Sequence, residues 1–416
     1  MRMTMAERIL ARAASKSSVK PGEFVTATID KFMCHEALAA VYGNLKKYGF
    51  KSIKNPENLI VALDHYSPAS TVRASEIHKI VRTAVKDLEV KYFYDTNAGV
   101  GHQLMVEKGH ALPGELIISS DSHTCMYGAL GAASCGVGFA EMTYALCTGV
   151  LWFKVPETVR FILKGKLPPL VSSKDIILMI AGRYSSSVAL YKSVEFVGPL
   201  LEELSIESRM TMSNMAVEIG AKFGFFPTDS LTKAYLAGKT ETDWEDITYD
   251  QQAKVYKEYE INADDLSPQV ALPHSVDRVV SIEDIDHIAI HQAVLGSCTN
   301  GRMEDLETAA DLMKGKKVHS NVRFYVVPAS MDIYREALRN GVLGILVESG
   351  ASILNPGCGP CFGAHMGLLA SGERCVSSTN RNFRGRMGSD NAEVYLASPA
   401  TVAASALKGY IADPRD

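Results

Sequence analysis

The sequence lacks the unbroken apolar run of about 20 residues that a membrane-spanning helix requires. It also has no excess of basic residues: 43 Lys and Arg stand against 47 Asp and Glu, a formal net charge of −4. Nucleic-acid binding relies on concentrated Lys and Arg, so the composition gives no electrostatic case for it. The N-terminal stretch has neither the apolar core nor the small-residue cleavage site of a signal peptide.

Cysteine is too sparse for a disulfide scaffold, with 8 residues in a chain of 416. We therefore expect a protein of the reducing cytoplasm. A chain of this length accommodates two or three domains, and its 47% apolar share suits a protein that buries several cores.

Three of the cysteines lie in Gly-rich segments. Cys358 and Cys361 form a Cys-x-x-Cys pair in NPGCGPCFG, and Cys298 lies 60 residues before Cys358, in GSCTNGR. Three thiolates are one too few for a closed zinc site and one more than a thioredoxin-like redox pair needs. A [4Fe–4S] cluster held by three thiolates leaves one iron open as a Lewis acid. The alternative is a chance pair in a loop, with Cys298 as a core thiol.

Strands and helices alternate along the first 150 residues. Buried strands are predicted at residues 24–29, 59–63, 92–94 and 116–118, with a helix at 69–88. This alternation is typical of parallel sheets flanked by helices, in which ligands bind beyond the carboxyl ends of the strands. Polar motifs follow three of these strands: Asp64-His65, residues 95–103 and residues 121–124.

The polar motifs supply histidines, and each histidine has a candidate carboxylate partner. A neutral histidine needs such a partner to fix its tautomer and raise its basicity for proton transfer near neutral pH. A lone Asp-His pair is more often a strand-end cap or a surface pair, but a set of three favours acid–base chemistry. The set comprises His65, His102 and His123 with Asp64, Asp121 and Glu218.

Two further parts continue the α/β pattern. The second is predicted to contain a strand at 159–163, helices at 172–180 and 213–222, and an exposed linker at 239–265. Asn214 and Glu218 would then share one helical face, with Arg209 and Lys222 as surface charges. The third is predicted to contain strands at 288–295, 322–327, 351–354 and 394–396, with helices after Thr299, Ser330 and Pro399.

We therefore predict an α/β fold of three domains, at residues 1–150, 151–268 and 269–416. The three cysteines Cys298, Cys358 and Cys361 follow strands of the last domain, whereas the histidines belong to the first. The active site should accordingly lie in a cleft between domains.

Seven motifs follow one another along nearly the whole chain. They are Asp64-His65, Gly101-His102-Gln103, Asp121-Ser122-His123-Thr124, Asn214-Met215 with Glu218 to Ala221, GSCTNGR, PGCGPC and NRNFRGRMG at residues 380–388. In this order they resemble the aconitase superfamily, and within it the large subunits of two-subunit enzymes such as 3-isopropylmalate dehydratase and homoaconitase. The resemblance implies three domains of mostly parallel sheets flanked by helices, without the swivelling fourth domain of single-chain aconitases.

The resemblance also implies one [4Fe–4S] cluster per chain, with Cys298, Cys358 and Cys361 as its three ligands. The Gly-rich residues 126–140, which contain no phosphate-binding motif, are expected to pack their backbone against this cluster. The remaining cysteines of that region are expected to be buried thiols and not ligands; they are Cys125, Cys135 and Cys147.

Two groups of site residues carry over from the family. The acid–base pairs around the open iron would be Asp64 with His65, Asp121 with His102, and Glu218 with His123. The first of these pairs would protonate the departing hydroxyl. Guanidinium groups bind carboxylates through two parallel hydrogen bonds, which suits a carboxylic acid substrate. The substrate-binding residues would be Arg381 and Arg386, with Asn214 and Asn380 beside them.

The reaction implied is the dehydration and rehydration of a hydroxyacid. Its base would come from the swivelling domain of a separate small subunit, so the large chain alone should be inactive. The expected substrate is an alkyl-substituted malate such as 3-isopropylmalate or 2,3-dimethylmalate, or alternatively homocitrate for a homoaconitase.

Two departures from the usual family sequence leave the substrate open. Glu36 stands in a His-Glu pair where His-Asp is usual, and residues 183–190 replace a Gly-rich segment. They mark either neutral drift or an altered pocket. Two other classes stay as alternatives: a zinc or redox Cys-x-x-Cys protein without hydro-lyase activity, and RNA binding by the chain without its cluster.

Overall fold

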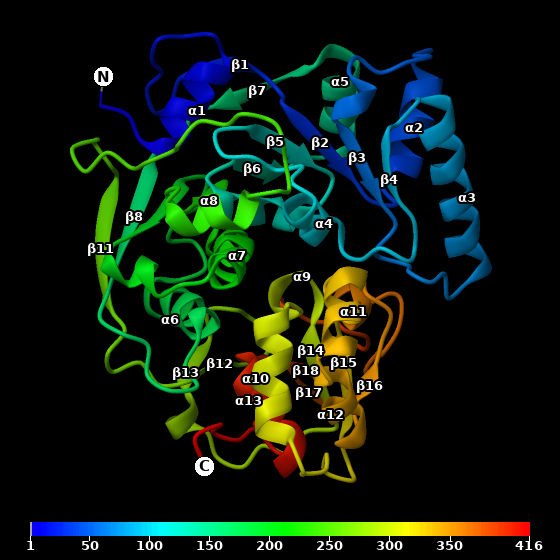
Figure 1. The fold of residues 1–416 in the computed structure, drawn as a ribbon, viewed down its shortest axis with the longest axis vertical. Helices are drawn as coiled ribbons and strands as arrows, with labels where there is room; N and C mark the ends of the chain where they lie inside the picture. The colour runs from blue at the N-terminus through cyan, green and yellow to red at the C-terminus, as the bar shows by residue number, and fades with distance from the viewer. Residues whose placement is uncertain (1) are drawn as a thin grey trace.

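In the computed structural model, which describes residues 2–416, the strands form three larger sheets and one two-stranded ribbon (Figure 1). The first sheet has five parallel strands in the order β4-β3-β2-β5-β6. Its strands are β2 Lys31–Cys34, β3 Leu59–Ala62, β4 Tyr92–Tyr94, β5 Leu116–Ser119 and β6 Ala133–Gly136. The strands predicted at 59–63, 92–94 and 116–118 therefore agree closely with β3, β4 and β5.

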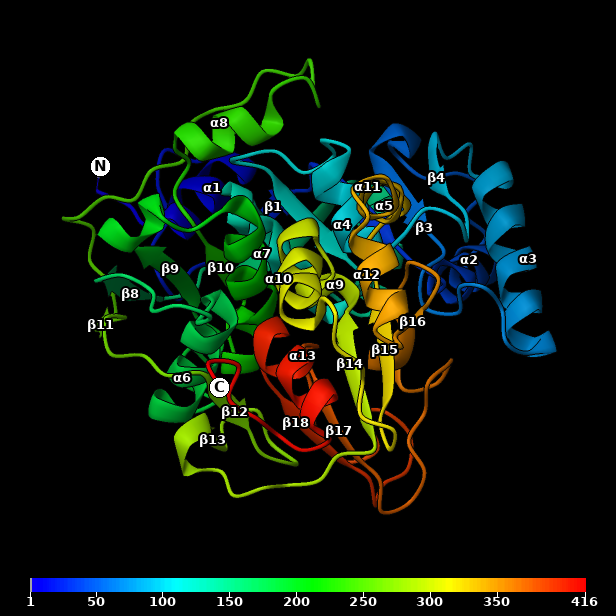
Figure 2. The same ribbon diagram turned by 60° about the horizontal axis from the view of Figure 1, so that its bottom comes forward.

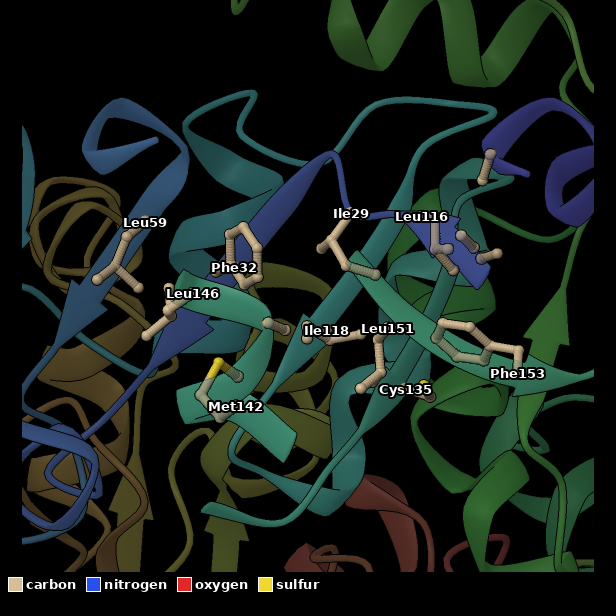
Figure 3. Close-up of a cluster of buried hydrophobic side chains, with 14 of the residues drawn as sticks. Ile29, Phe32, Leu59, Leu116, Ile118, Cys135, Met142, Leu146, Leu151 and Phe153 are labelled. Atoms are coloured by element: carbon tan, nitrogen blue, oxygen red, sulfur yellow. The ribbon is translucent and has the colours of Figure 1, made fainter. Parts of the chain in front are cut away.

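Helices cover both faces of this sheet, because successive side chains of each strand point to opposite sides. On one face, Phe32 and Leu59 share a core with α2 Leu38–Lys47, α3 Val72–Asp87 and α5 Phe139–Thr148. Figure 3 shows Met142 and Leu146 of α5 beside them. On the other face, Met33 and Ile60 pack with α4 Gly101–Glu107. A sheet covered on both faces leaves its strand ends as the place where polar side chains can gather.

The strand predicted at 24–29 is only half buried. It forms β1 Phe24–Thr28, which pairs antiparallel with β7 Val150–Lys154 in a separate ribbon. Val25 and Ala27 face the core, while Phe24 and Trp152 lie exposed on the outer side. An alternating pattern of exposure is what a two-stranded ribbon with one covered face produces.

The second sheet has four parallel strands in the order β10-β9-β8-β11. They are β8 Thr158–Lys164, β9 Ser193–Val197, β10 Phe223–Phe225 and β11 Lys257–Asn262. The prediction of a linker or exposed arm at 239–265 was wrong for residues 257–262, because β11 pairs with β8 over six residues; residues 239–256 form no helix or strand. β11 lies at the sheet edge, and its exposed Lys and Glu side chains give it the polarity of a linker.

Two other predictions for this part were also wrong. The helix predicted at 213–222 is instead the end of α7 Ile206–Met215, followed by a 3₁₀ turn over Ala216–Ile219 that stops at Gly220 with φ of +87°. Arg209 is not a surface charge: it is 0% exposed and donates to Asp229 and to the main-chain oxygen of Leu201. Lys222 is half buried beside Cys135, whose charge raises the pKa of the lysine.

The third sheet has seven strands in the order β13-β12-β18-β17-β14-β15-β16 (Figure 2). They are β12 Gln269–Ala271, β13 Val279–Ser281, β14 Gln292–Gly296, β15 Arg323–Val327, β16 Ser352–Ile353, β17 Arg374–Ser377 and β18 Glu393–Leu396. The sequence prediction missed β12, β13 and β17. Helices α10 Met303–Met313, α11 Met331–Arg339, α12 Val342–Glu348 and α13 Pro399–Lys408 cover this sheet and share its apolar core.

The Gly-rich segment packs its backbone against the second sheet at Gly128, and the close neighbours of Gly128, Gly131 and Gly136 include none of the predicted cluster ligands. A Cβ on Gly128 would lie 1.8 Å from the main-chain oxygen of Gly224 in β10, so the two backbones touch there. Cys125 and Cys135 are buried as expected, whereas Cys147 is half buried.

The larger sheets occupy successive parts of the chain, and we keep residues 1–150, 151–268 and 269–416 as proposed domain boundaries. Within residues 2–416, no helix has the length and apolar character needed to cross a membrane.

Candidate active site

A cavity of about 310 Å³ lies where the carboxyl ends of strands from the first and third sheets meet. It is lined by the three histidines of the predicted acid–base set and the three predicted cluster cysteines, although these come from segments far apart in the chain. The predicted site residues that line it are Asp64, His65, His102, Asp121, His123, Cys298, Cys358, Cys361, Asn380, Arg381 and Arg386. A larger cavity of about 500 Å³ beside α1 Met5–Ala13 contains none of these groups, so the chemistry points to the smaller one.

His65 is held by the carboxylate that precedes it. Its Nδ1 lies 2.6 Å from Oδ1 of Asp64, and the other Asp64 oxygen accepts a 2.7 Å hydrogen bond from the main-chain N–H of Gly101. Burial lowers the pKa of His65, but Asp64, Asp121 and Glu36 outweigh it and hold the pKa well above its usual range. A histidine in this setting keeps its proton, as an acid must before it donates.

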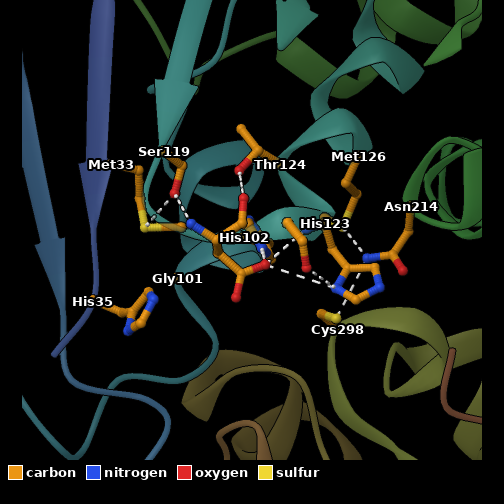
Figure 4. Close-up of polar contacts among 12 residues, drawn as sticks. Met33, His35, Gly101, His102, Ser119, His123, Thr124, Met126, Asn214 and Cys298 are labelled. Atoms are coloured by element: carbon orange, nitrogen blue, oxygen red, sulfur yellow. Dashed lines mark hydrogen bonds and ion pairs between the residues drawn. The ribbon is translucent and has the colours of Figure 1, made fainter. Parts of the chain in front are cut away.

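Asp121 lies between two histidines. Its Oδ1 accepts from His102 Nε2 at 2.8 Å, and its Oδ2 lies 3.4 Å from His65 Nε2. Figure 4 shows His102 together with His123, Asn214 and Cys298. The other ring nitrogen of His102 lies 2.9 Å from the hydroxyl of Tyr127, so both of its nitrogens have partners. Burial would raise the pKa of Asp121, but the histidines, His102 foremost, hold it well below its usual range.

The third pair, His123 and Glu218, is tied to an arginine. His123 Nε2 lies 2.9 Å from Oε1 of Glu218, and the same oxygen accepts from Nε of Arg381 at 2.7 Å. Arg381 also donates to Ser122 at 2.9 Å. Burial lowers the pKa of His123, but hydrogen bonds to Asp121 and Glu218 outweigh burial, so the pKa lies above its usual value. All three histidine–carboxylate pairs that the family resemblance implied are thus in hydrogen-bond contact.

The three cysteines are buried around the same cavity. Cys298 lies in the short helix α9 Ser297–Asn300 directly after β14, and Cys358 and Cys361 follow β16. Cys358 N–H donates to the main-chain oxygen of Asp64 at 2.9 Å, which joins the cysteine loop to the first acid–base pair.

Donors surround the sulfurs. Cys298 Sγ accepts from the amide nitrogens of Asn214 and Asn380, at 3.3 and 3.5 Å, and Cys361 Sγ lies 3.7 Å from a guanidinium nitrogen of Arg386. Cys358, aided by Arg386, holds the pKa of Cys361 well below its usual range, whereas burial raises the pKa of Cys298 to about 11. Among residues 2–416, no fourth cysteine lines this cavity.

This donor set fits an iron–sulfur cluster with three thiolate ligands. Fe–S clusters take Cys thiolates, and hydrogen bonds to the sulfurs tune them. A closed Cys₄ zinc site would need a fourth ligand that the cavity-lining cysteines do not provide. Asn214 is wholly buried and does not line the cavity. Its side chain contacts the sulfurs of Met126 and Cys298 and the side chains of Thr299 and Asn380, and its predicted contact with substrate stays a prediction.

The sequence analysis missed several residues around the site. His35 lines the cavity and stacks on His65 with ring centroids 4.2 Å apart. Glu36 turns away from the cavity, and it accepts from the main-chain N–H groups of His65 and Tyr66 at 3.0–3.3 Å and from His78 at 3.3 Å. The unusual His-Glu pair in the sequence pointed to His35 and Glu36. No sequence feature pointed to His78 or Tyr127.

His35, Glu36, Asp64 and His65 also lie close enough together to be considered as a second metal site. Their ligand atoms are already used, however: Ala37 N–H donates to Nδ1 of His35, and Asp64 bonds to His65. The cluster of side chains is therefore better explained as a hydrogen-bonded support for His65.

Comparison with known proteins identifies the family. The model of the aconitase family (aconitate hydratase) matches residues 61–409. The chain belongs to the aconitase family. Membership confirms the predicted resemblance, identifies the chain as a hydro-lyase, and implies an iron–sulfur cluster.

Relatives match this aconitase-family chain along its entire length. The large subunit 1 of 3-isopropylmalate dehydratase from Methanopyrus kandleri is 45% identical over 416 residues, which cover 100% of this chain and 99% of the relative. The corresponding subunit from Pyrococcus furiosus is 46% identical over 418 residues, with the same coverage. Both names contain "large subunit", which implies a small-subunit partner.

A solved structure supports the fold. Aconitase X from Thermococcus kodakaraensis in its holo form is 13% identical, with a TM-score of 0.51, over 88% of each chain. At this identity the likeness concerns the fold alone, and it agrees with the predicted α/β class.

Proposed function

We propose that the chain is the large subunit of a 3-isopropylmalate dehydratase. The observation that carries this proposal is the full-length identity of about 45% to large subunits that bear this name. The cavity supports it, since three thiols and three histidines, with Asp64 and Asp121, line one space of about 310 Å³. Glu218 does not line this space but contacts His123 at 2.9 Å.

Cys298, Cys358 and Cys361 would hold a [4Fe–4S] cluster. When bound, such a cluster supplies an open iron that acts as a Lewis acid toward a hydroxyl and a carboxylate. The chain contributes the N–H groups of Asn214, Asn380 and Arg386, which donate to the sulfurs and stabilise them as thiolates.

His65 is our candidate for the acid that protonates the departing hydroxyl. Asp64 fixes its ring through Nδ1, and its raised pKa keeps it protonated near neutral pH. Asp121, shared with His102, and the Glu218–His123 pair would complete the acid–base set and keep the neighbouring rings oriented.

Arg386 and Arg381 are proposed to bind the substrate carboxylates. Both line the cavity, and Nε of Arg386 is buried without a hydrogen-bond partner among the described residues. A buried donor of this kind is normally satisfied, so a ligand oxygen is a suitable partner for it. Arg381 is partly engaged by Glu218, which limits the donors that it can offer.

The partner is proposed to be a small subunit that carries the swivelling domain and the base of the reaction. The large chain alone should then be inactive. The cytoplasm, where an oxygen-sensitive cluster survives best, remains our predicted location.

The positions of the two departures from the family sequence favour 3-isopropylmalate over another alkylmalate or homocitrate, because neither departure lines the cavity. Glu36 points away from the cavity toward His78, and no residue of 183–190 lines it. An altered pocket would require these residues to lie close to the substrate. Neutral drift in sequence does not require this, so it explains the departures better. 2,3-Dimethylmalate and homocitrate stay as alternatives because the small subunit shapes part of the pocket.

The test is an anaerobic assay of the reconstituted chain with its small subunit. It follows formation of the unsaturated acid from 3-isopropylmalate, 2,3-dimethylmalate, homocitrate and citrate. We expect the strongest rate with 3-isopropylmalate. A strong rate with homocitrate alone would indicate a homoaconitase instead. No activity on any of the four acids, with an intact cluster, would show that the proposed substrate class is wrong.

A further inference from the structure

Lys174 has a buried amino group that its own helix does not stabilise. It lies in the first turn of α6 Ser173–Tyr184 and is 0% exposed. A positive charge at the N-terminus of a helix is opposed by the helix dipole, and burying an ammonium group without an anion is costly. In the part of the chain that the structure describes, Lys174 takes part in no ion pair.

Its ammonium group is bound instead by main-chain oxygens of the active-site loop. Nζ donates to the oxygens of Ser378 at 2.8 Å and Thr379 at 2.6 Å. These are the two residues directly before Asn380 and Arg381. Lys174 belongs to the second part of the chain and the loop to the third, so this contact joins the two across the site.

The same loop contacts the cysteines on its other side. The Ser378 hydroxyl accepts from the N–H of Gly296, two residues before Cys298, at 3.0 Å. Asn380 lies against both Cys298, at 3.5 Å, and Cys361, at 3.4 Å. A short chain of contacts therefore leads from the ammonium group to two of the proposed cluster ligands.

The nearby carboxylates are engaged elsewhere. Asp175 accepts from Ser172 and from the N–H of Gln269, and Asp305 accepts from Asn300 and the N–H of Arg302. Burial lowers the pKa of Lys174 to about 7, and Cys361 is foremost among the charges that oppose this. Cysteines that bind a cluster do so as thiolates, so in the loaded chain these sulfurs would supply negative charge to balance the lysine.

We propose that Lys174 is the fixed countercharge of the iron–sulfur site and ties the loop of Asn380 and Arg381 in place. The inference rests on the proposed function, because it assumes a cluster on Cys298, Cys358 and Cys361. Lys174 acts through the loop and through its charge, so it is a positioning residue. Cluster potentials depend on net charge and hydrogen bonding nearby. Removing the charge should therefore shift the midpoint potential to more negative values.

Three substitutions separate charge from contact. Lys174→Gln removes the charge but keeps N–H donors, Lys174→Arg keeps the charge, and Lys174→Met removes both. Lys166→Met is the matched control, since that lysine lies between β8 and α6 and its exposed side chain pairs with Glu203 at 3.9 Å. The midpoint potential of each reconstituted full-length chain is measured by anaerobic reductive titration, together with iron and sulfide content.

We expect the Gln and Met variants to have a more negative potential than wild type at equal iron content, and the Arg and Lys166→Met variants to match wild type. If the Met variant does not fold, the Gln and Arg pair decides the question. Equal potentials for the Gln variant and wild type would overturn the inference while leaving the proposed function intact. A wild-type chain that takes up no cluster would instead overturn the proposed function.

Discussion

Replacing Glu36 with leucine should disturb both stability and catalysis without touching the cavity. Glu36 is 5% exposed and accepts hydrogen bonds from the main-chain N–H groups of His65 and Tyr66 and from the His78 ring. Glu36→Leu leaves two main-chain donors and one ring donor without their acceptor. An unsatisfied buried donor costs about 1–3 kcal/mol.

The two main-chain donors belong to half-buried residues, so water recovers part of this loss. We take the lower end of the range for each and expect Glu36→Leu to lower the free energy of unfolding by about 2–3 kcal/mol. The loop that carries His65 then relaxes. A displacement of about 1 Å in a catalytic group can cost about 100-fold in rate, so kcat should fall by up to that factor while KM changes less.

Urea unfolding of the chain measures the first effect, and the assay with the small subunit measures the second. Glu76→Leu is the matched control, because that glutamate lies on α3 with 63% of its side chain exposed. An unchanged free energy of unfolding in Glu36→Leu, together with wild-type kcat, would refute the role of Glu36 as support for His65.

Four further predictions follow from other contacts. Burial would raise the pKa of Glu36, but hydrogen bonds from neighbouring histidines hold it well below 4.5. Its stabilising effect is therefore full above pH 4.5 and is lost as the pH falls from there through the lowered pKa of the folded state. The stability difference between wild type and Glu36→Gln should thus shrink on acidification, and a constant difference in urea unfolding would contradict this. Cys358→Ser should lose the cluster and the activity, measured as iron and sulfide content and as turnover. Full turnover by that variant would contradict the proposed mechanism. Glu218→Gln should lower the pKa of His123, which NMR of the ring can follow. The raised pKa of His123 stabilises the fold fully below pH 6.5, and this stabilisation is lost as the pH rises through the raised pKa of the folded state. Gly128→Ala should destabilise by about 3 kcal/mol or more because its Cβ would meet a main-chain oxygen of β10, whereas Gly344→Ala, a helical site with open space, should stabilise by up to about 1 kcal/mol in thermal unfolding.

The sequence predicted the buried strands β3 and β5, the half-buried β4, and the polar residues at their carboxyl ends, but it missed the buried strands β9 and β17. β3, β4 and β5 are short apolar runs followed by polar motifs, and this pattern places Asp64, His65 and Asp121 at one sheet edge without further information. The pairing of each histidine with its carboxylate came from the family resemblance, and the structure shows the contacts.

The errors concern segments whose environment is decided by distant parts of the chain. β11 has the charge pattern of a linker, and only its pairing with β8 makes it a strand. Arg209 is buried because main-chain oxygens of Leu201 and Leu204 and the carboxylate of Asp229 surround it. Lys174 and His78 were missed for the same reason, since a buried polar residue on a helix gives no local signal before its partner is known.

The most direct test of the central claim is turnover of 3-isopropylmalate by the anaerobically reconstituted chain with its small subunit, compared in parallel with the Cys358→Ser chain. We predict formation of the unsaturated acid by the wild-type pair and none by the variant. Equal turnover by both, or none by a wild-type pair with an intact cluster, would contradict the account.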